Sequence, residues 1–174
     1  MVDNKTSSPN HTLRPIEFAE WQTPVEFDEL QLVDLKYQAA TAVGFPQEGF
    51  SLRSPNKPLL EAGSLEATFL SRQKRSMVCF RFDAVAAFRV LDEHGLVDMW
   101  SSPARANPGS ATFKVRGHQW QEESFLVWFH GTDKDQYSWM IATGWDCLEV
   151  VTNVHPDVHL FPAVVTDYDA ADFR

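Results

Sequence analysis

The stretch MVCFRFDAVAAFRVLDEHG, residues 77–95, decides the fold class predicted for this chain. Val78, Phe80 and Phe82 alternate with residues that are small, polar or charged. This two-residue period is typical of a β-strand that buries one face and exposes the other. The stretch therefore predicts β structure, as one long bent strand or as two strands.

The alternation changes phase near Asp83 and Ala84 and resumes with Phe88 and Val90. Such a change predicts a bulge or bend, because an extra residue reverses the faces of the residues that follow. Residues 92–95 then predict a turn, and residues 96–100 a returning strand of a hairpin.

Apolar runs separated by turn residues continue on both sides of this stretch, and strands that follow one another usually pair antiparallel. A second hairpin is expected around the turn at 130–136. Pro162 lies inside the last run and restricts it to the edge of a sheet. The further strands are expected over residues 65–70, 111–117, 124–131, 137–144, 146–152 and 159–165.

The N-terminal part predicts a helix over residues 24–42. Thr23 is a candidate N-cap, Pro24 occupies the first helical position, and Glu26 completes a capping box. Apolar residues recur at helical spacing, and the glycine at position 44 predicts the end of the helix.

A competing interpretation makes this segment a strand with Leu30, Leu32, Lys36 and Gln38 on one face. It ranks second because it places two polar residues on an apolar face. The predicted class is α+β, with one curved, mainly antiparallel sheet of about six or more strands and one N-terminal helix. An all-β fold is the alternative.

The length of 174 residues suits a single domain over 1–174. Residues 1–15 are expected to be a flexible lead-in and 166–174 a frayed tail, and the proline- and glycine-rich residues 44–64 predict a long loop. No apolar run approaches the roughly 18 residues of a membrane span, and the polar N-terminus lacks the apolar core of a secretory signal. These features predict a bacterial, cytoplasmic protein.

The two cysteines, Cys79 and Cys147, are too few for a disulfide framework and too far apart for a CxxC motif. Both lie in apolar runs, where buried thiols are common. Whether they pair is left open by the sequence.

The formal net charge of −9 makes nucleic acid an unfavourable partner, because phosphate binding requires clustered lysine and arginine. An acidic surface serves solubility, and it also attracts a basic protein. The residues predicted to contact such a partner are Asp92, Glu93, Asp98, Glu122 and Glu123.

A second hypothesis places a small molecule or carbohydrate on a concave aromatic face of the sheet, with His118 and Trp120 as ligand-binding residues. His118 together with Glu122 or Glu123 and Ser124 contains the residue types of acid–base catalysis in a hydrolase. The G-x-S-x-G motif is absent, however, and no catalytic residue or cofactor is predicted.

His155, Asp157 and His159 share one face of an extended segment, and two histidines with a carboxylate are a recognised metal-binding set. No further ligand is evident nearby, and Asn153 and Pro156 favour a polar turn leading into an edge strand. A metal site is therefore kept as a third hypothesis and is not predicted.

The segments FDAVAAFRVLDEHGLVDMW, FKVRGHQWQEESF and YSWMIATGWDCLEVVT resemble small bacterial proteins of uncharacterised families across residues 77–152. In size and charge the chain is also similar to immunity proteins of contact-dependent and secreted toxin systems. Together with the charge, the single-domain size and the missing catalytic motif, that likeness implies a non-enzymatic protein-binding protein, an immunity-type inhibitor of a basic toxin. It is expected to be a monomer or, through an exposed sheet edge, a homodimer. The likeness assigns no functional residue.

Overall fold

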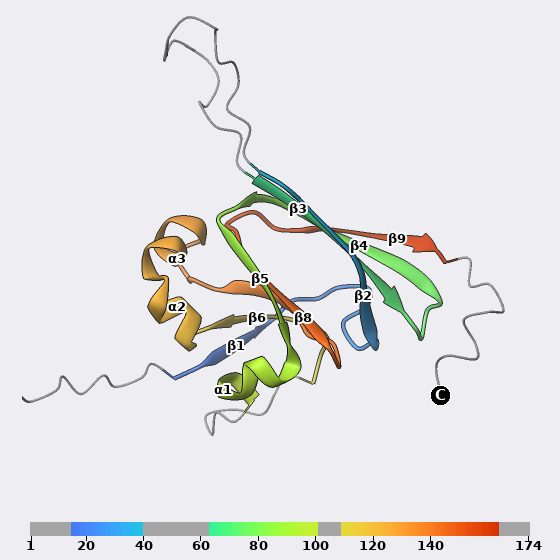
Figure 1. The fold of residues 1–174 in the computed structure, drawn as a ribbon, viewed down its shortest axis with the longest axis horizontal. Coiled ribbons are helices and arrows are strands. Elements are labelled where there is room, and N and C mark those ends of the chain that lie inside the picture. The colour runs from blue at the N-terminus through green and yellow to red at the C-terminus, as the bar shows by residue number, and fades with distance from the viewer. Residues whose placement is uncertain (1–14, 40–62, 101–108, 164–174) are drawn as a thin grey trace, which may run out of the picture.

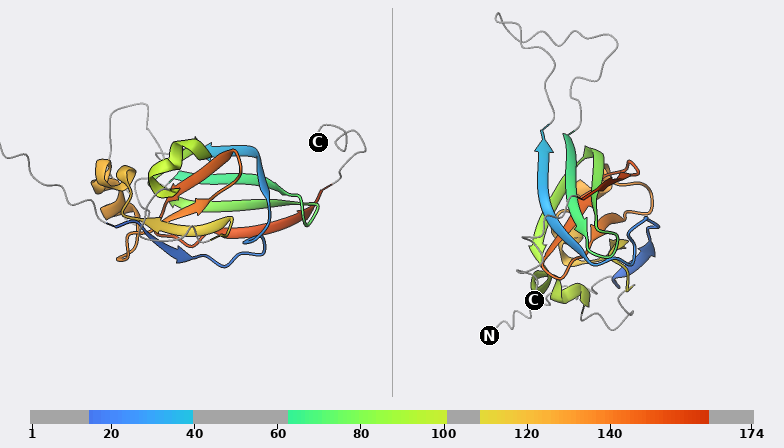
Figure 2. Two further views of the ribbon diagram at one scale, coloured as in Figure 1. Left: turned by 90° about the horizontal axis from the view of Figure 1, so that it is seen from below. Right: turned by 90° about the vertical axis from the view of Figure 1, so that its right-hand side faces the viewer.

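The computed structural model describes residues 15–39, 63–100 and 109–163. Within these ranges the chain forms nine strands in two antiparallel sheets (Figures 1 and 2). The first sheet has the order β1 (Glu17–Glu20), β6 (Thr112–Arg116), β7 (Ser138–Ile141), β8 (Asp146–Val151) and β5 (Ala87–Asp92). The second has the order β2 (Leu30–Gln38), β3 (Gly63–Ser71), β4 (Ser76–Val85) and β9 (Asp157–Pro162).

The helices of the described residues are short and follow the fifth strand. They are the 3-10 helix η1 (Glu93–Leu96), α1 (Val97–Trp100), α2 (Gln119–Glu123) and α3 (Phe125–Gly131). The protein is thus mostly β, and the prediction of an α+β fold with one sheet and an N-terminal helix is wrong.

The predicted helix over 24–42 is wrong because Leu30–Gln38 form β2, which contains an irregularity. The pairing of β2 with β3 shifts between Leu32 and Asp34, which is a β-bulge. Leu32 packs on the core before the bulge and Leu35 after it, so apolar residues are three positions apart there. The helical spacing itself came from Phe27, Leu30, Val33 and Tyr37, of which only Leu30 is buried, so these residues do not form one apolar face. The predicted cap at Thr23 forms only a turn, in which the Val25 amide donates to Thr23 Oγ1 at 3.3 Å.

The predicted bend in the opening stretch is confirmed. β4 ends at Val85 and β5 begins at Ala87, and Ala84 between their apolar runs has a left-handed φ of 53°. The Ala86 amide donates to the Val151 carbonyl at 2.9 Å, which ties the bend to the end of β8. Because β4 and β5 belong to different sheets, the bend carries the chain from one sheet to the other.

Two other predicted strands are helical. Residues 96–100 lie in η1 and α1, and residues 124–131 lie mostly in α3, so neither predicted hairpin forms. A short apolar run does not distinguish a strand from a partly buried helix. The strands expected over 65–70, 111–117, 137–144 and 146–152 are present, and β9 lies at a sheet edge and ends at its proline.

Parts of other predictions lie outside the described residues. These are the lead-in before residue 15, the end of the predicted helix at 40–42, the loop over 44–62 and the tail over 166–174.

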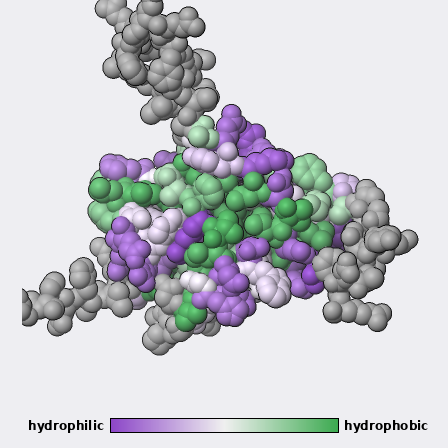
Figure 3. Space-filling view, viewed as in Figure 1, coloured by the Kyte–Doolittle hydropathy of each residue, from purple (hydrophilic) through white to green (hydrophobic). Residues whose placement is uncertain are grey.

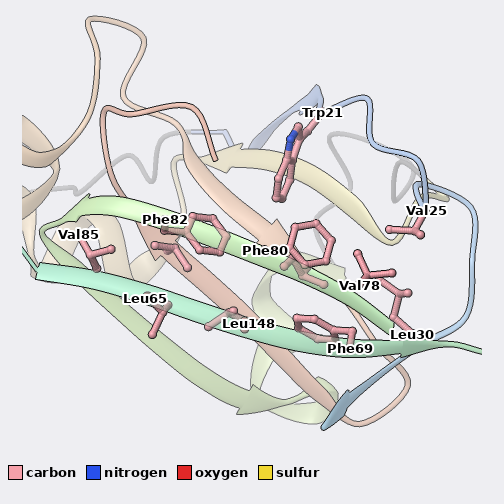
Figure 4. Close-up of a cluster of buried hydrophobic side chains, with 13 residues drawn as sticks. Trp21, Val25, Leu30, Leu65, Phe69, Val78, Phe80, Phe82, Val85 and Leu148 are labelled. Atoms are coloured by element: carbon pink, nitrogen blue, oxygen red, sulfur yellow. The ribbon is translucent and has the colours of Figure 1, made fainter. Parts of the chain in front are cut away.

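The main core lies between the two sheets (Figure 4). Phe69 and Phe80 of the second sheet and Leu148 of the first are fully buried there. Trp21 also belongs to this core and contacts both sheets: its ring centroid lies 5.6 Å from that of Phe80 and 4.9 Å from that of Trp139. A second cluster covers the other face of the first sheet and includes residues of η1 and α1. The first sheet is therefore covered on both faces, and short helices pack on its outer face.

Gly131 ends α3 at the point where the helix meets the sheet bend. A Cβ atom at this position would collide with Ala86 Cβ and lie 3.1 Å from Val151 Cγ1. At Gly144, by contrast, an added Cβ would meet nothing within 4 Å. The absence of a side chain at Gly131 thus sets how closely α3 approaches the sheet.

We expect Gly131→Ala to lower the free energy of unfolding by about 1–3 kcal/mol, because overpacking forces the helix and the sheet apart. Gly144→Ala is the matched control and should change it by less than about 0.5 kcal/mol. Urea unfolding followed by circular dichroism measures both. Equal midpoints for the two variants would show that α3 does not depend on this close approach.

Candidate functional site

A buried carboxylate, Glu149 of β8, organises the outer face of the first sheet. Leu148 and Val150 point into the core between the sheets, so the alternation of the strand turns Glu149 to the opposite face. There α2 and α3 cover it, and Glu149 is only 1% exposed. A charge buried to this extent requires partners that replace water.

Four hydrogen bonds supply those partners. Glu149 Oε2 accepts from Arg89 Nε at 2.8 Å and from Arg89 Nη2 at 2.7 Å. Oε1 accepts from Ser138 Oγ at 2.5 Å and lies 2.7 Å from His118 Nε2. Arg89 is the cross-strand partner of Glu149 on β5, Ser138 belongs to β7, and His118 precedes α2. One carboxylate thus joins three strands and a helix.

Burial by itself raises the pKa of Glu149, but its partners reverse the direction. The hydrogen bond from His118, the charges of His118 and Arg89 and the hydrogen bond from Ser138 together hold the pKa below its ordinary value. Glu149 is therefore ionised at neutral pH and only accepts hydrogen bonds. It follows that His118 carries a hydrogen on Nε2 and donates a hydrogen bond from it to Glu149.

Ser138, His118 and Glu149 are residue types found in hydrolase triads, but their arrangement differs. The serine hydroxyl and the imidazole both bind the same carboxylate oxygen, so the histidine does not activate the serine. Ser138 is also fully buried and out of reach of a substrate. The geometry serves to hold the carboxylate.

The predicted ligand-binding residues His118 and Trp120 are both part of this assembly. The side chain of His118 is buried, whereas Trp120 lies at the margin. The Trp120 ring has the Arg89 guanidinium 4.5 Å from its centroid on one side and the fully buried Trp128 ring at 4.6 Å. Trp120 therefore packs on the network, and His118, at 1% exposure, is not open to a ligand in this arrangement.

The outward side of α3 is apolar. Phe125, Leu126 and Phe129 are 47%, 68% and 56% exposed, and the two phenylalanine rings lie 6.0 Å apart. The inward side carries the fully buried Trp128, whose ring contacts those of His118 and Trp120. The space-filling view of Figure 3 shows hydrophobic surface at this end of the molecule as well as across the middle of the face. We call Phe125, Leu126 and Phe129, with the adjacent Glu122 and Glu123, the α3 surface.

The predicted acidic contact residues fall into two groups. Glu122 and Glu123 are exposed at the end of α2, next to the apolar residues of α3. Asp92 and Glu93 lie at the start of η1, and Asp98 lies in α1 with its side chain outside the described part of the structure. Figure 1 shows α1 apart from α2 and α3, so the five residues do not form one surface.

The remaining candidates are not assembled into a site. His155 lies against the Trp139 ring at 5.0 Å, while Asp157 and His159 are exposed on β9. Among the residues described, no three histidine, cysteine, aspartate or glutamate side chains are grouped to hold a metal ion. Cys79 and Cys147 are both free and lie in different sheets.

Comparisons with known proteins give no relative for this chain. No family model, curated protein or solved structure matches it. None of the helices within 15–39, 63–100 and 109–163 is long and apolar enough to cross a membrane.

Sequence reasoning missed the central pair, Arg89 and Glu149. The available signal was a charged residue in the middle of each of two otherwise apolar strands. Such residues on neighbouring strands become partners when the strands pair in register, which the sequence of a single chain does not reveal.

We expect Glu149→Gln to lower the free energy of unfolding by about 3 kcal/mol, because the amide nitrogen would face donors and leave Arg89 without its carboxylate. Glu122→Gln, which changes an exposed carboxylate in the same way, is the control and should have little effect. Urea unfolding monitored by tryptophan fluorescence measures the difference. A wild-type midpoint for Glu149→Gln would contradict a stabilising role of the network.

We also expect the stability difference between wild type and Glu149→Gln to depend on pH. Because the folded-state pKa of Glu149 is lowered, its contribution is complete above the unfolded-state value of about 4.3 and is lost as pH falls through the folded-state value. The difference in unfolding free energy between wild type and Glu149→Gln should therefore shrink in acid. A difference that stays constant from neutral pH to acid unfolding would refute the lowered pKa.

Proposed function

We propose that this protein binds another protein through the α3 surface. The observation that carries the proposal is the exposure of Phe125, Leu126 and Phe129 on one short helix, in which His130 is the one polar side chain. An amphipathic surface helix buries its apolar side and presents a polar one. Contiguous exposed apolar side chains with a polar margin are typical of protein–protein contacts.

The chemistry of the margin favours a basic partner. Glu122 and Glu123 are exposed beside the apolar residues, and the chain has a formal net charge of −9. Oppositely charged surfaces accelerate encounter and exclude partners of the same charge. A second copy of this chain is disfavoured, because it would bring its own acidic residues to the same contact.

Within this class, we propose an immunity-type inhibitor that covers the functional surface of a basic toxin. The size and acidity of the chain support this form of the proposal. Ser138 and His118 both hydrogen-bond Glu149, so the histidine does not activate the serine. This arrangement supports a binding function over hydrolysis.

Site-specific photo-crosslinking in the native cell tests the proposal. A photoreactive residue at Leu126 should capture one basic protein at a defined ratio, whereas the same residue at Glu66, exposed on the second sheet, should not. Crosslinking to a second copy, to another segment of the same chain, or equally from both positions would overturn the proposal.

The captured protein, once purified, allows a quantitative test. Leu126→Ser and Phe129→Ser should each weaken its affinity by about tenfold or more, as truncation of apolar anchors does at interfaces. Val33→Ser is the control, because Val33 is 55% exposed on an edge strand of the second sheet. Glu122→Lys with Glu123→Lys should mainly slow association at low salt. Unchanged affinities for the α3 variants would refute the proposed contact.

A further inference from the structure

A hollow of about 230 Å³ lies where β2 meets the loop between β7 and β8. The lining residues are Gln31, Leu32, Thr143, Trp145 and Asp146. The two segments are brought together by the core, in which Leu30 of β2 and Ile141 and Leu148 of the first sheet share one cluster. The hollow is therefore built by both sheets, and it is separate from the α3 surface.

Trp145 is 73% exposed at this hollow, although its backbone is fixed. Its amide donates to Thr143 Oγ1 at 3.0 Å, and its carbonyl accepts from the Glu93 amide at 2.9 Å. An indole held out on an ordered turn loses little conformational freedom when it contacts a ligand. Exposure of this side chain has no evident role in folding.

The charges at the hollow are unbalanced. Asp146 stands directly opposite Asp92 in the pairing of β8 with β5, and like charges in this position are destabilising. Asp92 has a partner in His94, whose Nδ1 lies 2.6 Å from its carboxylate. Asp146 forms no side-chain ion pair within the described ranges. The hollow thus contains a carboxylate without a cation.

Gln31 also lines the hollow. Its side-chain oxygen Oε1 is buried and accepts no hydrogen bond from any described residue. A hollow of similar size, about 260 Å³, is lined by Glu17 and Arg116, but these two already pair with each other at 2.7 Å. The hollow at Trp145 differs because it offers a carboxylate and an aromatic ring without a positive group in its lining.

We propose that this hollow binds a single cationic side chain, the guanidinium of arginine or the ammonium of lysine, presented by another polypeptide. The cation would lie against the Trp145 ring and next to the Asp146 carboxylate. Tryptophan is the most favourable aromatic residue for cation–π contact. The volume of about 230 Å³ is several times the roughly 30 Å³ that one water molecule takes in the liquid, so the hollow accommodates such a head group.

Nuclear magnetic resonance of the full-length protein tests the proposal with a defined probe. Nα-acetyl-arginine amide should shift the Trp145 indole N–H signal saturably, and the same probe built on citrulline, which is uncharged and has nearly the same shape, should not. Binding of one side chain is expected to be weak, in the millimolar range. An equal response to citrulline, a response to a neutral disaccharide but not to arginine, or no saturable shift would overturn the proposal.

Variants identify the groups responsible. Trp145→Leu should remove the interaction, followed by the Asp146 amide signal, and Asp146→Asn should weaken it about threefold to fivefold. Asp157→Asn, an exposed aspartate on β9, is the matched control and should leave binding unchanged.

Asp146→Asn should not lower the midpoint of urea unfolding, because it removes a like-charge pair. Loss of binding together with loss of stability would mean that the residue is structural. Neither measurement uses a protein partner, so failure here leaves the α3 proposal untouched, and failure of that proposal leaves this one intact.

Discussion

The arrangement of the helices on the first sheet depends on the buried carboxylate of Glu149. Removing an ion of this size from water costs several kcal/mol even after the surroundings relax. The cost is offset only when Arg89, Ser138 and His118 all donate to it. These donors come from β5, β7 and the residue before α2, so the strand order and the position of α2 must be correct together.

The position of the α3 surface depends on this network. His118 lies against the Trp128 ring with centroids 5.6 Å apart, and Trp128 is the residue by which α3 is anchored to the sheet. Gly131 then sets the distance between the end of the helix and the β4–β5 bend. A surface held in this way would lose little conformational entropy on binding a partner.

The sequence alone predicted the bend near Ala84, the edge position of the strand containing Pro162 and most of the strands after residue 63, because period-two patterns and turn residues are local signals. It failed at β2, where apolar residues at helical spacing do not share a buried face, and at α3, where an apolar run fits either structure. For the site, the sequence named Glu122 and Glu123 as partner contacts, which stays a prediction, and both side chains are exposed. The pairing of Arg89 with Glu149 was not, since it arises from register between strands 60 residues apart.

Exposed apolar residues do not all require a partner. Val33 is exposed at the bulge of an edge strand, where irregularity and neighbouring charges hinder pairing with other sheets. No comparable explanation applies to the three exposed apolar residues of α3, which neither protect an edge nor contribute to the core. The same chain supplies four hydrogen bonds to Glu149 but leaves Asp146 opposite another aspartate. Because folding explains the first carboxylate and not the second, binding is the stronger explanation for the unpaired acid at Trp145, as it is for the apolar side of α3.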